Sequence, residues 1–329
     1  MLSSKWIWYL VSTAILAGLG YFADFEKFIA SLSSADPFYF SLAFVFGMTF
    51  FLSNAVIWRS FLREAGVELS LWKSAKLFMG GQFMNSVTPL GQFGGEPLMA
   101  YIISDNTDAG YDQSVSSIVS ADIINSAPFI TFSGAALLYL SLFGSLNSRL
   151  VDIAYLVVIL LVVLSAAGYL LWFEKEKLEN FVIGVLTKAE SIMNRDQAFE
   201  GLKEKVRDAA ELFQSFGKNP RHLLRASLIS HASGLAQVIC MIFVLQSLGY
   251  SPGIAAVTLT VILSSLASFS PTPGGTGTIE AAMTGLLLLF TSIPPDEALA
   301  AAVLFRLTTY WPGLPLGYLS ILSLRSSKK

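Results

Sequence analysis

The pattern of hydrophobic positions along the chain is dominated by long apolar stretches. A helix needs about 20 mostly apolar residues to cross a hydrocarbon core about 30 Å thick. Stretches of this kind lie at roughly 6–23, 38–58, 114–143, 150–172, 222–248 and 298–322. The first follows Lys5 and resembles a signal peptide, but no convincing small-x-small cleavage site precedes the next polar residues, so we expect an uncleaved anchor. The pattern predicts an all-α integral membrane protein with about six transmembrane helices.

Two further regions, 74–104 and 254–292, are apolar but interrupted. The helix expected from Ser74 to Val87 would be about 21 Å long at 1.5 Å per residue, which is too short to cross the membrane. We expect each region to be a re-entrant helical hairpin that enters the membrane and returns on the same side. A loop of the soluble type is the alternative, and the flanking apolar residues fit it poorly.

The two interrupted regions contain the same short phrase. Residues 88–96 read Thr-Pro-Leu-Gly-Gln-Phe-Gly-Gly-Glu, and residues 272–280 read Thr-Pro-Gly-Gly-Thr-Gly-Thr-Ile-Glu. The positions they share are Thr88 and Thr272, Pro89 and Pro273, Gly91 and Gly275, and Glu96 and Glu280. Pro stops a helix and Gly accepts backbone conformations that other residues resist. Paired interruptions at corresponding positions of two halves indicate a transport site near the membrane midplane.

The basic residues of the connecting segments predict that both termini are cytoplasmic. They cluster after the second span, in the long segment after the fourth span, and at the C-terminus, whereas loops 24–37, 144–149 and 249–253 are poor in them. With six spans, the first hairpin enters from the cytoplasm and the second from outside. The two halves then form an inverted-topology repeat, an arrangement of many secondary transporters.

The one long polar stretch, 173–220, has nearly balanced charge and the periodicity of two amphipathic helices. We interpret residues 1–329 as a single transmembrane domain, with 173–220 as a cytoplasmic helical loop within it. This loop packs on itself or on the bundle, or it docks a partner enzyme. A lipid-sensing basic helix fits less well because Glu and Lys are interspersed.

Composition supports a membrane protein and excludes several other classes. Hydrophobic residues make up 54% of the chain and charged residues 13%, about half the usual charged share of a soluble domain. A net charge of −2 without a basic stripe gives no case for nucleic-acid binding. The single cysteine, Cys240, excludes a disulfide framework, and no His or Cys spacing suggests zinc. The glycines at 274–277 are not followed by Lys-Ser/Thr, so we expect neither an ATP site nor another cofactor.

Four charged residues fall within apolar regions and are the main site candidates. Glu96 and Glu280 each either cap the helix that follows the break or take part in substrate or proton handling. Arg306 either pairs with one of these carboxylates or binds an anionic lipid phosphate. Asp122 is the fourth buried charge, and an ionisable residue inside a membrane is a functional candidate by default.

Backbone and polar groups near these charges complete the candidate site. Gly274, Gly275 and Gly277 leave the backbone bare enough for close approach by a headgroup, and the half-helix N-termini favour anions. The polar residues that line the same cavity or bond helices to one another are Asn54, Gln82, Asn85, Asn125 and Gln237.

These phrases resemble the flippase-like family, which is the transmembrane region of lysylphosphatidylglycerol synthases. The resemblance rests on Pro271-Thr272-Pro273-Gly274-Gly275-x-Gly277-x-x-Glu280, on Arg306 before Tyr310-Trp311-Pro312, and on Asn85-Ser86-Val87-Thr88-Pro89-x-Gly91-x-x-Gly94-Gly95-Glu96-Pro97. It extends over nearly the whole chain and implies translocation of a lipid. It assigns a role to Glu96, Glu280, Arg306 and these Pro and Gly positions. Bifunctional members carry a soluble aminoacyl-transferase domain, but this chain stops at Lys329, so we expect no enzyme activity.

The sequence thus predicts a lipid translocase in a prokaryotic plasma membrane. Its substrate is a phospholipid, an aminoacyl-lipid or a polyprenyl-phosphate lipid with an anionic or zwitterionic headgroup. Two alternatives remain. One is an ion-coupled transporter of a small solute. The other is a non-transporting subunit that docks a lipid synthase or glycosyltransferase, and a homo-oligomer is compatible with each.

Overall fold

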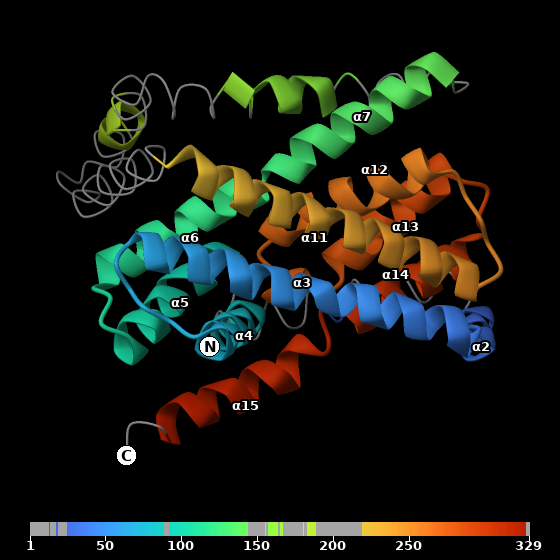
Figure 1. Ribbon diagram of the computed structural model, residues 1–329. Helices are drawn as coiled ribbons and strands as arrows, with labels where there is room; N and C mark the ends of the chain where they lie inside the picture. Colours follow the sequence, from blue (N-terminus) through green and yellow to red (C-terminus); the bar gives the residue numbers. More distant parts are fainter. Residues whose placement is uncertain are drawn as a thin grey trace.

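A computed structural model describes residues 25–88, 92–143 and 219–326, with shorter stretches between 155 and 188 and positions 13 and 18 (Figure 1). Within these residues all regular structure is helical, as predicted. The first half contains α2 (Phe25–Ser34), α3 (Pro37–Glu64), α4 (Leu71–Val87), α5 (Gln92–Asn106), α6 (Tyr111–Asn125) and α7 (Ala127–Phe143). The second contains α11 (Pro220–Ser247), α12 (Ile254–Ser264), the 3-10 turns η1 (Ser265–Phe269) and η2 (Pro273–Gly275), α13 (Thr278–Phe290), α14 (Pro295–Thr309) and α15 (Gly313–Ser326).

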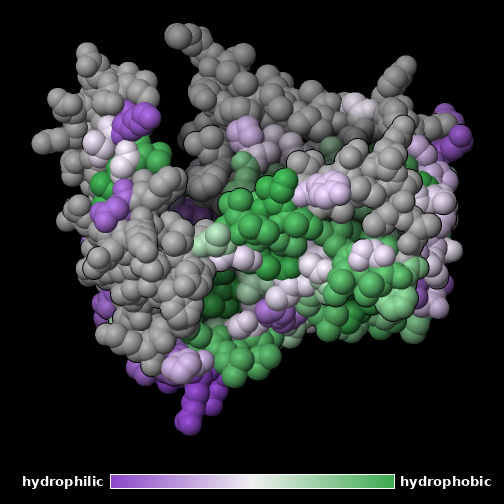
Figure 2. Space-filling model, turned by 90° about the horizontal axis from the view of Figure 1, so that it is seen from above, coloured by the Kyte–Doolittle hydropathy of each residue, from purple (hydrophilic) through white to green (hydrophobic). Residues whose placement is uncertain are grey.

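The predicted spans at 38–58, 114–143 and 222–248 fall on helical stretches that are long and apolar enough to cross a membrane: Pro37–Glu64, Tyr111–Phe143 and Pro220–Ser247. Large hydrophobic side chains such as Phe38, Trp72 and Phe143 are exposed on the described surface, and Figure 2 shows hydrophobic residues over much of one face. The predictions for 6–23, 150–172 and 173–220 lie largely outside the described residues. The stretch 298–322 is divided between α14 and α15 by a turn at 310–312.

The two longest helices, α3 and α11, pack side by side and run antiparallel (Figure 1). Each starts with a proline in its first turn and a side-chain cap: Asp36 accepts from the amides of Phe38 and Tyr39, and Asn219 accepts from His222. At one end the Asp36 backbone amide donates to the Ser247 carbonyl at 2.8 Å. At the other, the Asn219 side-chain amide donates to the Glu64 carboxylate at 3.0 Å. These end-to-end contacts fix the opposite direction of the two helices.

The helices of the two halves correspond in order and in register. Shared residues of the repeated phrase, such as Thr88 and Thr272, are 184 positions apart. The same shift carries α6 onto the bounds of α14. It also carries α3 onto α11 within one residue, and each of these helices has 28 residues. Because α3 and α11 run antiparallel, the two halves of the described chain are arranged as an inverted repeat.

Each half places its last helix against the other half's interrupted helix pair. Helix α15 packs along α4, and α7 packs along α12. The α4–α15 contact is close because Gly317 lies directly against the Met79 carbonyl and the Phe83 side chain, and a Cβ at Gly317 would collide with both. As a result, each of the two helix pairs, α4–α5 and α12–α13, contacts a helix from the other half.

The two helix pairs meet at the break of the second pair. Helices α4 and α5 run antiparallel, since Gly81 lies against Met99 and Gly95 against Asn85. Turn η2 contacts α4, and η1 contacts α5. The second copy of the repeated phrase therefore lies against α4, and the turn just before it lies against α5.

Candidate functional site

A buried ion pair lies at the break of the second helix pair. Arg306, near the end of α14, donates from Nε to Glu280 Oε1 at 3.1 Å and from Nη2 to the Gly274 carbonyl at 2.9 Å. Its guanidinium carbon also lies 3.7 Å from the centre of the Tyr310 ring, one turn further along. The exposed fraction is 6% for Arg306 and 3% for Glu280. The salt-bridge interpretation of Arg306 is therefore correct in this structure, and two of its five N–H donors are used by these bonds.

Glu280 also caps the helix that it begins. Its Oε2 accepts from the Gly277 amide at 2.8 Å, and it is the third residue of α13. A carboxylate in the first turn also offsets the positive end of the helix dipole. Glu280 thus performs the capping role that the sequence suggested, while its second oxygen binds Arg306.

The glycines of the second phrase are required by backbone conformation. Gly274, Gly275 and Gly277 have φ angles of +59°, +66° and +85°, which residues with a Cβ adopt only with strain. Gly274 also lies directly beneath Tyr310, where a Cβ would collide with the phenol. These residues hold the carbonyl that accepts from Arg306 in place.

A cluster of hydroxyl groups stabilises the same turn, and the sequence alone identified only one of its members. Ser270 Oγ lies 2.9 Å from Thr272 Oγ1 and 2.6 Å from Thr278 Oγ1. Thr278 also donates to the Gly275 carbonyl at 3.0 Å. The Ser-x-Thr spacing within a broken helix was the available signal, since these side chains bond readily to local backbone.

The carboxylates of the two helix pairs occupy different positions in their helices. Thr88 ends α4, with its Oγ1 donating to the Met84 carbonyl at 2.6 Å. Pro89 and Gly91 lie outside the described residues. Glu96 is half-buried and is the fifth residue of α5, not a first-turn residue as the sequence suggested. It therefore lies too far along α5 to cap the helix as Glu280 caps α13.

The remaining candidates occupy helices around this centre. Asp122 lies on α6 and is exposed, so the prediction that it is a buried charge is wrong in this structure. Asn125 donates to Asn54 Oδ1 at 2.9 Å, which bonds α6 to α3 in the way expected of polar residues in membrane helices. Asn85 packs against Gly95. Within the part of the chain that the structure describes, no group of three His, Cys, Asp or Glu residues could hold a metal ion.

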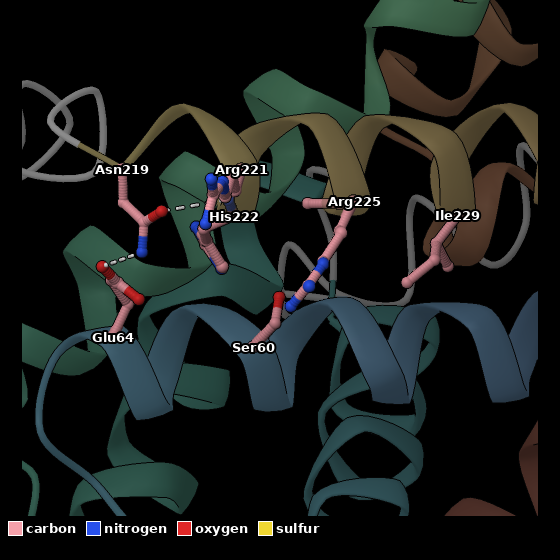
Figure 3. A pocket seen from close by; sticks show the side chains of 8 residues that line it. Ser60, Glu64, Asn219, Arg221, His222, Arg225 and Ile229 are labelled. Carbon is pink, nitrogen blue, oxygen red and sulfur yellow. Dashed lines mark hydrogen bonds between the residues drawn. The ribbon is translucent and has the colours of Figure 1, made fainter.

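A pocket of about 460 Å³ lies away from this centre, between the end of α3 and the start of α11 (Figure 3). Its lining residues are Ser60, Glu64, Asn219, Arg221, His222, Arg225, Ala226 and Ile229. Sequence reasoning did not identify it, although two arginines four residues apart at a span boundary were a signal.

Comparison with known proteins gives a consistent result over nearly the full length. Residues 9–317 match the model of the family described as the lysylphosphatidylglycerol synthase transmembrane region. A UPF0104 membrane protein of Pyrococcus horikoshii is 24% identical over 98% of this chain and 97% of its own length. A UPF0104 membrane protein of Methanocaldococcus jannaschii is 24% identical over 96% of this chain and 93% of its own length. A third UPF0104 membrane protein, of Archaeoglobus fulgidus, is 26% identical over 95% of this chain and 94% of its own length.

Proposed function

Because this chain belongs to the family of the lysylphosphatidylglycerol synthase transmembrane region, we propose that it translocates a membrane lipid between leaflets. The lipid has an anionic or zwitterionic headgroup, in the class of phospholipids, aminoacyl-lipids and polyprenyl phosphates. The pairs α4–α5 and α12–α13 are re-entrant hairpins in this proposal, and the chain acts without an enzymatic step.

The observation that carries the proposal is the contact of the broken second helix pair with α4 and α5 of the first pair. Backbone that leaves helical geometry inside a bilayer must be satisfied by protein or by water in a cavity. The breaks therefore favour a polar path for a headgroup between the hairpins, while the acyl chains stay in the surrounding lipid. The inverted arrangement of the halves is also typical of transporters whose site lies between the repeats.

The charged residues take distinct roles in this proposal. Arg306 holds the lipid phosphate with the N–H donors that its bonds to Glu280 and Gly274 leave over, since a guanidinium can bind phosphate through two parallel bonds. The N-terminal amides of α13 assist it. Glu280 positions Arg306, and the exposed pocket residues Arg221 and Arg225 attract anionic headgroups at the membrane surface.

The test is leaflet exchange of fluorescent phospholipids and a polyprenyl phosphate in proteoliposomes, with and without a proton gradient. We expect Arg306→Ala and Glu280→Gln to reduce exchange by at least about tenfold, which corresponds to about 1.4 kcal/mol. Matched controls are Arg325→Ala and Glu68→Gln, which remove the same charges at exposed positions and should exchange lipid as the wild type does.

The alternatives predict different results. A small-solute transporter would exchange none of these lipids and would accumulate a soluble substrate under an ion gradient. A docking subunit would exchange no lipid, would be insensitive to Glu280→Gln, and would lose its function when 173–220 is deleted. Absence of exchange by folded wild-type protein with all these lipids would overturn the proposal.

A further inference from the structure

Three contacts hold the guanidinium of Arg306. Two are the bonds from Nε to Glu280 at 3.1 Å and from Nη2 to the Gly274 carbonyl at 2.9 Å. The third is the Tyr310 ring, whose centre lies 3.7 Å from the guanidinium carbon. This is the separation of carbon atoms in van der Waals contact. A guanidinium that met the ring edge-on would keep its carbon further away, because a nitrogen would stand between them. The ring therefore lies against one face of the guanidinium.

The Tyr310 ring is itself held in place. Its residue is 8% exposed, and its phenol lies directly against Gly274, where a Cβ would collide with it. The Tyr310 amide donates to the Arg306 carbonyl, and the Gly313 amide donates to the Tyr310 carbonyl, both at 2.9 Å. The ring also packs edge to face with Trp311, with 5.8 Å between the ring centres. Its position is thus fixed by the backbone on both sides and by the turn beneath it.

A fixed guanidinium plane matters for binding a phosphate. Bonds to Glu280 and Gly274 use Nε and Nη2, and none of the described residues accepts a hydrogen bond from Nη1. A phosphate bound through two parallel hydrogen bonds must lie near the plane of the guanidinium. Two in-plane bonds alone allow a planar group to tilt about the line that joins their acceptors. A ring against one face prevents this tilt.

We propose that Tyr310 is a positioning residue of the anion site, which holds the guanidinium of Arg306 so that the edge bearing Nη1 is presented to a lipid phosphate. An aromatic ring suits this role because it attracts a desolvated cation without using its N–H donors or neutralising its charge. A second carboxylate in the same place would do both and would repel the phosphate. This inference rests on the lipid translocation proposed above and adds the means by which the headgroup is held.

The pair of cation and ring occurs in only one half of the repeat. The shift of 184 residues that relates the two phrases carries Arg306 onto Asp122 and Tyr310 onto Ser126. The first half therefore has neither the cation nor the ring at these positions. Although the fold is duplicated, the inference predicts a single phosphate site of this kind in each chain.

The experiment measures phosphate binding separately from transport. Purified full-length protein in detergent is titrated with dioctanoyl phosphatidylglycerol, and the bound lipid is counted by native mass spectrometry. Dioctanoylglycerol, which has the same acyl chains and no phosphate, measures binding by the chains alone. We expect the wild type to bind one phospholipid per chain in preference to dioctanoylglycerol. Leaflet exchange of the same variants is measured in parallel.

The variants distinguish the ring from the phenol hydroxyl. Tyr310→Leu removes the ring and should weaken phospholipid binding by about thirtyfold, which corresponds to about 2 kcal/mol for a desolvated contact between a cation and a ring. Tyr310→Phe keeps the ring and should bind as the wild type does. Tyr318→Leu is the matched control, since it removes a tyrosine that is 52% exposed on α15. If Tyr310→Leu does not fold, Tyr310→Met takes its place.

A double-mutant cycle separates an effect through Arg306 from a general loss of structure. In the background Glu280→Gln/Arg306→Gln, no unpaired charge remains and no guanidinium is left to position. There Tyr310→Leu should change the residual phospholipid affinity by less than about twofold, which is the usual error of additivity. A ring that only supports the fold would cause the same loss in both backgrounds.

That equal loss would overturn the inference, as would a Tyr310→Phe variant that binds as weakly as Tyr310→Leu. A folded Tyr310→Leu variant with wild-type affinity would overturn it too and would leave the proposed function standing. Phospholipid binding that follows the expected pattern without any leaflet exchange would contradict the proposed function alone. Wild-type protein that binds dioctanoylglycerol as tightly as the phospholipid would overturn both.

Discussion

At the scale of single residues, the buried ion pair between Arg306 and Glu280 is the main feature of the described structure. Both side chains are almost fully buried, so removing either partner leaves an uncompensated charge away from water. The pair also links three elements, since Arg306 on α14 bonds to Glu280 on α13 and to Gly274 in η2. Its loss is therefore expected to affect stability as well as transport.

Arg306→Ala should destabilise the protein by about 3–5 kcal/mol, the typical cost of breaking a buried ion pair. The double variant Glu280→Gln/Arg306→Gln should recover part of this loss because no unpaired charge remains. Reversible unfolding in mixed detergent micelles measures the difference. The exposed pair Arg63–Glu68, at 3.3 Å, is the control, and Arg63→Ala should cost about 0–1 kcal/mol. Equal effects of Arg306→Ala and Arg63→Ala would contradict the buried-pair interpretation.

A second prediction at this scale concerns Gly274. The change Gly274→Ala places a Cβ at φ +59°, which costs about 1–2 kcal/mol, and it also displaces Tyr310 from its contact. We expect a lower midpoint of thermal unfolding and weaker lipid exchange. Gly253→Ala is the control, since Gly253 has φ −62° and open space around it. A midpoint for Gly274→Ala within error of that for Gly253→Ala would show that the contact with Tyr310 is unimportant.

At the scale of elements, the sequence predicts the long helices and the two breaks but not the details of each break. The apolar stretches and the Thr-Pro-x-Gly phrase depend on local residue types, and three of the predicted spans agree with the described helices. The difference between Glu96 and Glu280 depends on where each helix starts. Helix α13 starts at Thr278 because Gly277, at φ +85°, is not helical. The corresponding Phe93 is already within α5.

The division of 298–322 into two helices was likewise not predicted, although Pro312 and Gly313 were signals for it. Helix α14 ends at Thr309 with Tyr310 as its C-cap, and α15 begins at Gly313. The corresponding boundary between α6 and α7 lies at Ser126, just before Pro128. Helix α6, which carries Asp122, and helix α14, which carries Arg306, thus both end about one turn beyond the charged residue. The contact between Arg306 and Tyr310 fits their spacing of four residues on a helix.

At the scale of the whole molecule, the two related halves run in opposite directions, and in the proposed function this makes the pairs α4–α5 and α12–α13 open to opposite sides of the membrane. The repeated phrase indicated two related halves, and the antiparallel pair α3–α11 supplies their relative direction. The exchange of α7 and α15 between the halves has no local sequence signal because it depends on contacts across the repeat.

This arrangement predicts the sidedness of four exposed positions. Glu68 and Asp108 flank the first helix pair, and Ser251 and Ser292 flank the second. Cysteines at Glu68 and Asp108 should react with an impermeant maleimide only in opened membranes. Cysteines at Ser251 and Ser292 should react in intact cells. Cys240 is buried, so the wild-type chain serves as the unlabelled control. Reaction of all four positions from the same side would exclude an inverted repeat.

Because α15 packs along α4, the surroundings of α4 are completed only after α15 has been synthesised. About 225 residues separate the end of α4 at Val87 from the start of α15 at Gly313. At a synthesis rate of about 5–20 residues per second, the ribosome needs roughly 10–45 seconds to produce them. Throughout that interval the face of α4 that contacts α15 lacks its final neighbour. The pair α4–α5 is among the earliest described parts of the chain to be synthesised, and it reaches its native surroundings only when α15 is complete.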